Sequence, residues 1–176
     1  MTWTPLDTGN RWAVLGVALT ALALAAAVTR AGEALAGEPW ALVNESPSLP
    51  RGLYARAPGA APVRGAVVAV PQPPAARAYL GALGMPAEVL LIKRVAASPG
   101  QSVCRQGAVV VAHGRTAAVL ERDRYGRRLP GWGGCRRLGP NELFLLGDTP
   151  TSFDSRYFGP VDRRDIVGVY RGVATW

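Results

Sequence analysis

From residue 38 onward, frequent glycine and proline divide the chain into short apolar runs, and this pattern restricts the fold most strongly. The sequence holds 21 Gly and 15 Pro. The runs have the length and the β-branched content of strands. They are LYARA at 53–57, GAVVAV at 65–70, VLLIKRVA at 89–96, GAVVVA at 107–112, TAAVL at 116–120, ELFLL at 142–146 and IVGVYRGVA at 166–174. We predict one mainly β domain.

Two other segments complete the expected fold. Residues 73–84 begin with proline and end with glycine, which predicts a short helix. Residues 121–140 have no strand pattern and are expected to form a long loop or insert. No repeat of fixed period occurs, and helices do not alternate with the strands, so the pattern does not indicate a parallel sheet.

Residues 12–29 form an uncharged apolar segment of about 27 Å as a helix, at the lower limit for a membrane span. Arg11 precedes it, and Arg30 is followed by two glutamates. This charge distribution predicts a cytoplasmic N-terminus and an exported remainder. We expect an uncleaved anchor in residues 1–37 and an exported domain in residues 38–176.

A cleaved signal peptide is the alternative, because Ala34-Leu35-Ala36 fits a small-x-small cleavage site. Export would place the chain in an oxidising compartment. We then expect Cys104 and Cys135, the two cysteines, to form a disulfide closing a loop of about 30 residues. A pair of free buried thiols is the other interpretation.

The composition excludes several classes. A chain that is 49% hydrophobic and 18% charged is too apolar for a disordered polymer. Two Cys and one His are too few for a structural zinc site without carboxylates, and we expect neither metal nor cofactor. A catalytic Ser-His-Asp triad would need His113, but the His113-Gly114 pair between apolar runs is more typical of a hairpin turn.

The net charge of +8 comes from basic residues scattered along the chain, with RDRYGRR at 122–128 the only dense run. The chain has neither a helix-turn-helix pattern nor a basic stripe interleaved with aromatic residues. We therefore expect no nucleic-acid partner, and attribute to the charge at most a preference for an anionic membrane surface.

Lys93 is the one lysine among the 20 basic residues. In a strand over 89–96, Leu91, Lys93 and Val95 share one face, so Lys93 lies on an apolar face. Burial lowers the pKa of a lysine, and a neutral amine can act as a general base without histidine. The alternative is a lysine that extends from a strand edge and keeps its charge in water.

Two further segments carry hydroxyl groups that a base could activate. In the segment NESPSLPRG at 44–52, Pro47 and Pro50 restrict the backbone around Ser46 and Ser48. The segment GDTPTSFDSRYFG at 147–159 follows a predicted strand and brings a serine close to an Asp-x-Arg pair. Taken singly, the first is also consistent with a Ser/Pro linker and the second with a polar loop.

Together the three segments resemble the Ser-Lys signal peptidases, and specifically the TraF-type peptidases of conjugative transfer systems. The resemblance rests on SPSLPRGLY at 46–54, LIKRVAASPG at 91–100 and LGDTPTSFDSRYFGPV at 146–161, in this order after an anchor. The general bacterial enzyme typically has Ser-Met-x-Pro-Thr at its nucleophile. Here Ser48-Leu49-Pro50-Arg51-Gly52 is one residue shorter and matches the TraF branch better.

The resemblance implies a role for each matching residue. Ser48 would be the nucleophile, favoured over Ser46 by the Ser-x-Pro spacing, and Lys93 its general base. The backbone N–H of Ser48 and the hydroxyl of Ser46 would stabilise the oxyanion. Ser152 would orient the lysine. Asp154 and Arg156 would form a supporting ion pair.

The resemblance also implies a substrate and a location. The partner would be a precursor protein, bound as an extended strand and cut after small residues, and the TraF-type resemblance implies a conjugative pilin that is trimmed or cyclised. The enzyme would lie in the bacterial inner membrane with its catalytic domain in the periplasm. The alternatives are a general or secretion-specific signal peptidase and a non-enzymatic basic scaffold of a transfer apparatus. A self-cleaving Ser-Lys repressor fits less well, because the first 45 residues contain no recognisable DNA-binding domain.

Overall fold

A computed structural model describes residues 16–25 and 37–176, and the chain divides into two compact units, residues 1–39 and 40–176. Residues 16–25 are helical. Within the described residues, we find no helix with both the length and the apolar character that crossing a membrane requires. The membrane span expected over 12–29 lies partly outside the described residues and stays a prediction.

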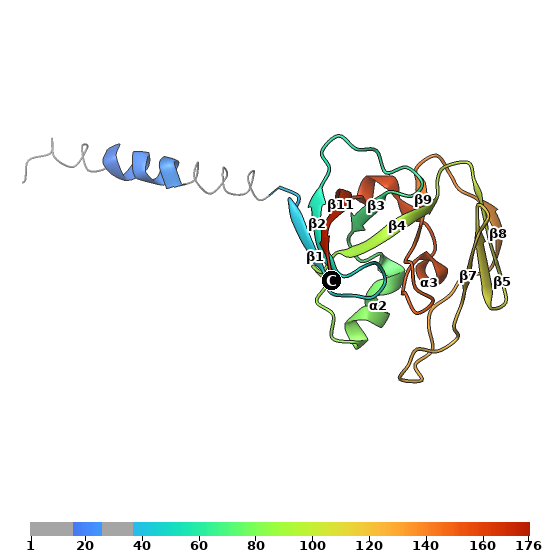
Figure 1. Ribbon diagram of the computed structural model, residues 1–176. Helices are drawn as coiled ribbons and strands as arrows, with labels where there is room; N and C mark the ends of the chain where they lie inside the picture. Colours follow the sequence, from blue (N-terminus) through green and yellow to red (C-terminus); the bar gives the residue numbers. More distant parts are fainter. Residues whose placement is uncertain (1–15, 26–36) are drawn as a thin grey trace, which may run out of the picture. The chain divides into compact units, whose positions relative to one another are not determined.

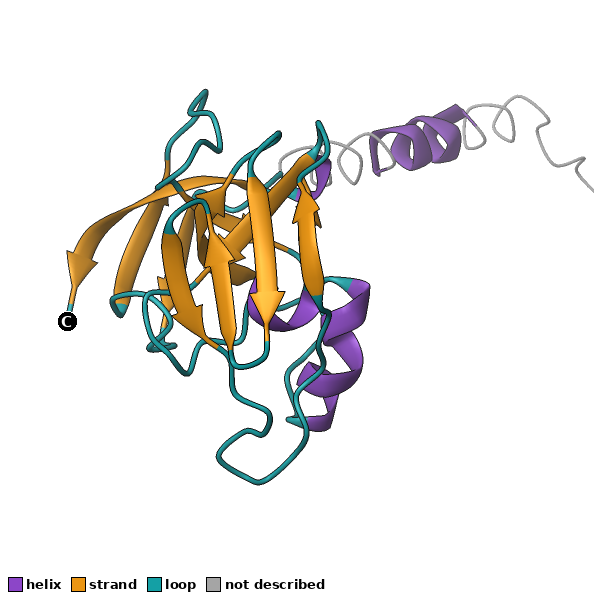
Figure 2. Cartoon of the chain, turned by 90° about the vertical axis from the view of Figure 1, so that its right-hand side faces the viewer, coloured by secondary structure: helices purple, strands orange, loops and turns teal. Residues whose placement is uncertain are grey.

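The second unit is mainly β, as predicted, and contains two antiparallel sheets (Figures 1 and 2). The larger sheet has the strand order β1-β2-β11-β3-β4-β9-β10. Its strands are β1 (Ala41–Asn44), β2 (Gly52–Arg56), β3 (Val67–Val70), β4 (Leu91–Ala97), β9 (Glu142–Leu146), β10 (Val161–Asp162) and β11 (Gly168–Thr175). The smaller sheet has the order β7-β6-β5-β8. Its strands are β5 (Ser102–Gln106), β6 (Val109–Ala112), β7 (Arg115–Ala118) and β8 (Gly134–Arg137).

Three short helices accompany the sheets: α2 (Pro74–Ala82), α3 (Ser155–Phe158) and the 3-10 turn η1 (Arg163–Asp165). The helix predicted over 73–84 is confirmed as α2, which has proline in its first turn. Helix α3 was not predicted. Asp154 is its N-cap, with a side chain that accepts a hydrogen bond from the Arg156 N–H, and four helical residues are too few to give a periodic pattern.

The prediction that 121–140 is a loop was wrong at its end, because residues 134–137 form β8. All four residues of β8 are exposed, so no apolar alternation marks them as a strand. Backbone pairing with β5 fixes this strand, and Cys104 stands directly opposite Cys135 in the register. The structure joins these two cysteines in a disulfide.

The turn predicted at His113-Gly114 is confirmed. It connects β6 to β7, and both residues have positive φ, 46° at His113 and 83° at Gly114. Such a pair of angles is typical of a type I′ hairpin turn, which favours glycine at its second position. His113 is therefore explained by the turn, and it does not line the cleft described below.

The core packs against both faces of the larger sheet. On one face Leu91, Val95 and other strand residues pack against Ala76 and Leu80 of α2. On the other face Ile92 packs with Tyr54 and residues of β3 and β11. The predicted alternation along β4 is thus correct, and Lys93 shares the apolar face of Leu91 and Val95. A third cluster joins the smaller sheet to β9.

Candidate active site

The serine segment is the loop of a β-hairpin, since β1 pairs with β2 and Asn44 stands opposite Gly52. The side chain of Asn44 is buried inside this loop. Its amide nitrogen donates to the carbonyls of Ser46, Leu49 and Pro50 at 2.9, 3.1 and 3.1 Å, and its oxygen accepts from the Ser46 N–H at 3.2 Å. One neutral side chain therefore fixes the shape of the loop, a role that the sequence analysis missed.

Ser48 lies at the centre of this loop and is only 4% exposed. The hydroxyl of Ser46 donates to Ser48 Oγ at 2.7 Å, and the Ser48 N–H donates to Ser46 Oγ at 3.1 Å. The Ser46 hydroxyl and the Ser48 N–H, the two donors expected to bind the oxyanion, therefore donate to acceptors inside the loop. For both to reach a substrate oxygen, the exposed side chain of Ser46 has to rotate away from Ser48.

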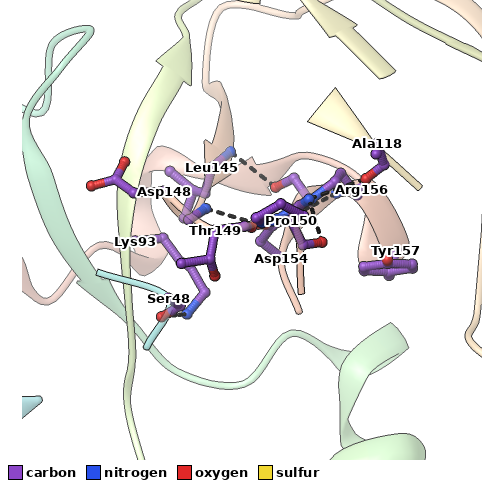
Figure 3. Close-up of polar contacts among 12 residues, drawn as sticks. Ser48, Lys93, Ala118, Leu145, Asp148, Thr149, Pro150, Asp154, Arg156 and Tyr157 are labelled. Carbon is purple, nitrogen blue, oxygen red and sulfur yellow. Dashed lines mark hydrogen bonds and ion pairs between the residues drawn. The ribbon is translucent and has the colours of Figure 1, made fainter. Parts of the chain in front are cut away.

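Lys93 extends from β4 toward Ser48 (Figure 3), and its Nζ lies 2.8 Å from Ser48 Oγ. Its second hydrogen bond, at 3.0 Å, goes to the carbonyl of Ile92. Lys93 is 5% exposed. Burial lowers its pKa from 10.5 to about 8, while Asp154 raises the pKa and Arg156 lowers it. A fraction of the amine is therefore neutral near physiological pH, and this amine is adjacent to a hydroxyl.

Ser48 and Lys93 line a cleft of about 350 Å³. The cleft is lined by residues 43–48, 89–93, 149 and 151–153, together with Leu80 and Met85. Strand β1 is an edge of the larger sheet and leads directly into the cleft. An extended peptide that adds to this edge would have its backbone beside Ser48.

Asp154 and Arg156 form the predicted ion pair, and both are almost fully buried, at 0% and 1% exposure. The guanidinium binds the carboxylate through two contacts of 2.8 and 2.7 Å. Its other three N–H groups donate to the carbonyls of Ala118, Pro150 and Thr149 at 3.1, 2.9 and 2.9 Å. All five guanidinium donors therefore have partners, which is the condition for burying this charge at acceptable cost.

This ion pair fixes the segment from Gly147 to Ser152 that borders the cleft (Figure 3). Asp154 accepts a hydrogen bond from the Gly147 N–H at 2.8 Å, while Arg156 holds the two carbonyls that follow Asp148. A Cβ at Gly147 would overlap the Ser152 hydroxyl and approach the Ser48 carbonyl to 2.8 Å. Only glycine fits between these groups.

Asp148 connects this segment to the serine loop, a role that the sequence analysis also missed. Its N–H donates to the carbonyl of Ser48 at 2.6 Å. Its carboxylate accepts two hydrogen bonds from Arg94 of β4, at 3.1 and 2.8 Å, and one from Arg115 at 3.4 Å. The hydrogen bond from Arg94 lowers the pKa of Asp148, although partial burial opposes this shift. The adjacent Gly-Asp pair of residues 147 and 148 was the available sequence signal.

Ser152 lies in the same cleft as Lys93, but the expected hydrogen bond between them is not present. Within residues 16–25 and 37–176, Ser152 Oγ and Thr149 Oγ1 are buried without a hydrogen-bond partner. The lysine donates instead to Ser48 and to its own neighbouring carbonyl, which lie within reach of Nζ.

Cys104 and Cys135 link neighbouring strands of the smaller sheet and do not line the cleft. Across the described part of the chain, no three His, Cys, Asp or Glu side chains gather in a way that would hold a metal ion. The chemistry available in the cleft is that of a hydroxyl beside an amine of lowered pKa.

Comparisons with known proteins identify the family of this chain. A family model described as signal peptidase, peptidase S26, matches residues 11–176. A plasmid transfer protein TraF from Escherichia coli is 38% identical over 166 residues, which cover 86% of this chain and 91% of the relative. A conjugal transfer protein TraF from Agrobacterium fabrum is 38% identical over 89 residues, covering 49% of each chain. A signal peptidase I crystal structure from Enterococcus faecalis aligns with 62% of this chain and 97% of its own, at a TM-score of 0.39 and 23% identity. The match over nearly the whole length shows that this chain belongs to the S26 family of signal peptidases.

Proposed function

We propose that this chain is a serine endopeptidase in which Ser48 is the nucleophile and Lys93 the general base. The observation that carries the proposal is the 2.8 Å contact between Lys93 Nζ and Ser48 Oγ, both buried, in a cleft at a sheet edge. The pKa of about 8 at Lys93 supports it, because a general base is most effective when its pKa is near the working pH.

The reaction takes place in two stages. The neutral amine of Lys93 takes the proton of Ser48 while the serine oxygen bonds to the scissile carbonyl carbon. The C–N bond then breaks, the Lys93 ammonium gives this proton to the leaving amine, and the acyl group remains on Ser48 as an ester. A water molecule next loses a proton to Lys93 and bonds to the acyl carbon, and the serine oxygen leaves with that proton.

The developing oxyanion needs two donors, and the Ser48 N–H and the rotated Ser46 hydroxyl are suited to this role. Loss of one such donor typically costs about 10²–10³ in rate. If an amine of the same substrate chain replaces water in the second stage, the product is cyclic. Its mass is then lower by one water molecule than that of the linear product of hydrolysis.

The substrate that we propose is the exported precursor of a conjugative pilin, cut after a small residue. The names of the relatives, which refer to plasmid and conjugal transfer, support this choice. We place residues 12–29 in the inner membrane and the catalytic unit in the periplasm. The Cys104–Cys135 disulfide is consistent with this oxidising location.

The test is co-expression with a pilin-like precursor from the same transfer region, followed by mass spectrometry of the product. We expect Ser48→Ala to abolish processing and Ser46→Ala to leave partial activity. Ser102→Ala, at an exposed serine of β5 outside the cleft, is the matched control and should process normally. Full processing by Ser48→Ala would rule out the proposed nucleophile.

A further inference from the structure

The segment 120–130, here called the arm, extends from the smaller sheet and lies beside α2 (Figures 1 and 2). Hydrogen bonds within the arm define its conformation. The backbones of Arg122 and Arg128 form an antiparallel bridge, and the Leu129 N–H donates to the backbone carbonyl of Glu121 at 2.9 Å. At its tip, one oxygen of Asp123 accepts from the N–H groups of Tyr125 and Arg127 at 2.8 and 2.9 Å.

Hydrogen bonds fix the arm to helices α2 and α3. The hydroxyl of Tyr79 in α2 donates to the second oxygen of Asp123 at 3.0 Å. Arg127 donates to the carbonyl of Ala82 at the end of the same helix at 2.7 Å. At the base of the arm, the Leu120 N–H donates to the Tyr157 hydroxyl at 3.1 Å. The tip is therefore held in one position relative to α2.

This tip presents an aromatic ring and a cation to the solvent. Tyr125 is 63% exposed, and the Arg124 guanidinium lies 4.7 Å from the centre of its ring. Among the described residues, the hydrogen bond of the Arg124 side chain goes to the Tyr125 hydroxyl, at 2.7 Å. Tyrosine and arginine are both enriched at protein interfaces relative to the rest of the surface.

Between the arm and α2 lies a groove of about 500 Å³, which we call the arm groove. It adjoins the catalytic cleft, because both cavities are lined by Pro47, Leu80, Met85, Thr151 and Phe153. The ring of Phe153 stacks against Tyr79 at 4.5 Å and against Tyr157 at 5.4 Å, and these two tyrosines also anchor the arm.

We propose that the arm groove is a second binding site for the substrate polypeptide, at a distance from the scissile bond. It takes an apolar side chain whose neighbouring residue is acidic. The five lining residues that the two cavities share place them side by side, which argues for one polypeptide that reaches both. The acidic neighbour follows from the charge of residues 121–128, which carry four arginines against Glu121 and Asp123, the latter bonded to Tyr79.

This inference rests on the proposed peptidase function, and the experiment separates the two. A fluorogenic core peptide with alanine before the cut is compared with two extended peptides that carry Phe-Glu several residues away, on the N-terminal or the C-terminal side. We expect one extension to raise kcat/KM about tenfold, through KM. Tyr125→Ala and Arg124→Glu should remove this gain and leave the core peptide unaffected. Arg163→Glu, an exposed arginine of η1 outside both cavities, should keep it.

A direct binding measurement uses the full-length Ser48→Ala protein and the labelled extended peptides, read by fluorescence anisotropy. Arg124→Glu should prefer a Phe-Lys extension over Phe-Glu, a reversal that misfolding would not produce. If the core peptide is cleaved but neither extension adds affinity, the arm groove is refuted and the peptidase stands. If binding depends on Arg124 and Tyr125 but no peptide is cleaved, the groove stands and the peptidase is refuted.

Discussion

Lys93 and Arg156 are two buried cationic side chains whose hydrogen-bond partners differ in number and in charge. Arg156 has a bidentate carboxylate and three carbonyls for its five donors. Lys93 has one hydroxyl and one carbonyl, and its pKa is lowered by burial. A buried charge with all its partners is a structural element, whereas a buried amine without a carboxylate partner tends to lose its proton.

Lys93→Arg gives the largest expected effect in this comparison. The guanidinium keeps the positive charge but does not release a proton near neutral pH, so it does not act as a base. We expect kcat/KM to fall by at least about 10³-fold, measured on the peptide or precursor used for the wild type. An active Lys93→Arg enzyme would show that activity needs only a positive charge at this position. Lys93 would then not be a general base, and its contrast with Arg156 would fail.

Arg156→Met tests the structural side of the comparison. It leaves Asp154 buried without its partner, so we expect a loss of about 3–5 kcal/mol in the free energy of unfolding. Adding Asp154→Leu removes the isolated charge, and the double variant should lose less than the sum of the two single variants in denaturant titrations. Arg164→Met is the matched control, since Arg164 and Asp162 have the same spacing and two-point contact at the surface. Its stability should not change.

The pH dependence of activity and of stability tests the lowered pKa of Lys93. Lys93 is protonated below its pKa of about 8 and cannot accept the serine proton, so kcat/KM should rise with pH and level off above 8. Between pH 8 and 10.5 the unfolded chain binds the proton and the folded chain does not, so stability rises with pH over this range. We expect a gain of about 3 kcal/mol, absent in Lys93→Met. A pH-independent difference between wild type and Lys93→Met would contradict the lowered pKa.

Asn44 is the neutral counterpart of Arg156, because each side chain donates hydrogen bonds to three backbone carbonyls and so fixes a loop near the cleft. Asn44→Ala leaves the carbonyls of Ser46, Leu49 and Pro50 without this donor, and we expect a loss of about 1–3 kcal/mol in stability. A lower kcat at unchanged KM should accompany it, because Ser48 is less well positioned. Asn141→Ala, at an exposed asparagine, is the control for both measurements.

The sequence by itself determined the mainly β class, the helix α2, the turn at His113 and the apolar face on which Lys93 lies. These features depend on residues that are close together in the chain, where side-chain alternation and turn preferences act directly. The sequence also indicated, through a resemblance, which serine and lysine belong together. It missed β1, β5, β8 and β10, whose positions depend on pairing with partner strands rather than on their own pattern.

Only the tertiary structure decided how the cleft is assembled. Ser48 and Lys93 are 45 residues apart in the chain, and three strands lie between β1 and β4 in the sheet, so the contact depends on the tertiary path of the serine loop. The five hydrogen bonds of the Arg156 guanidinium and the shared lining of the cleft and the arm groove likewise arise where separate segments of the chain meet. No local pattern encodes these contacts, because they form between backbone groups whose positions are set by the packing of both sheets.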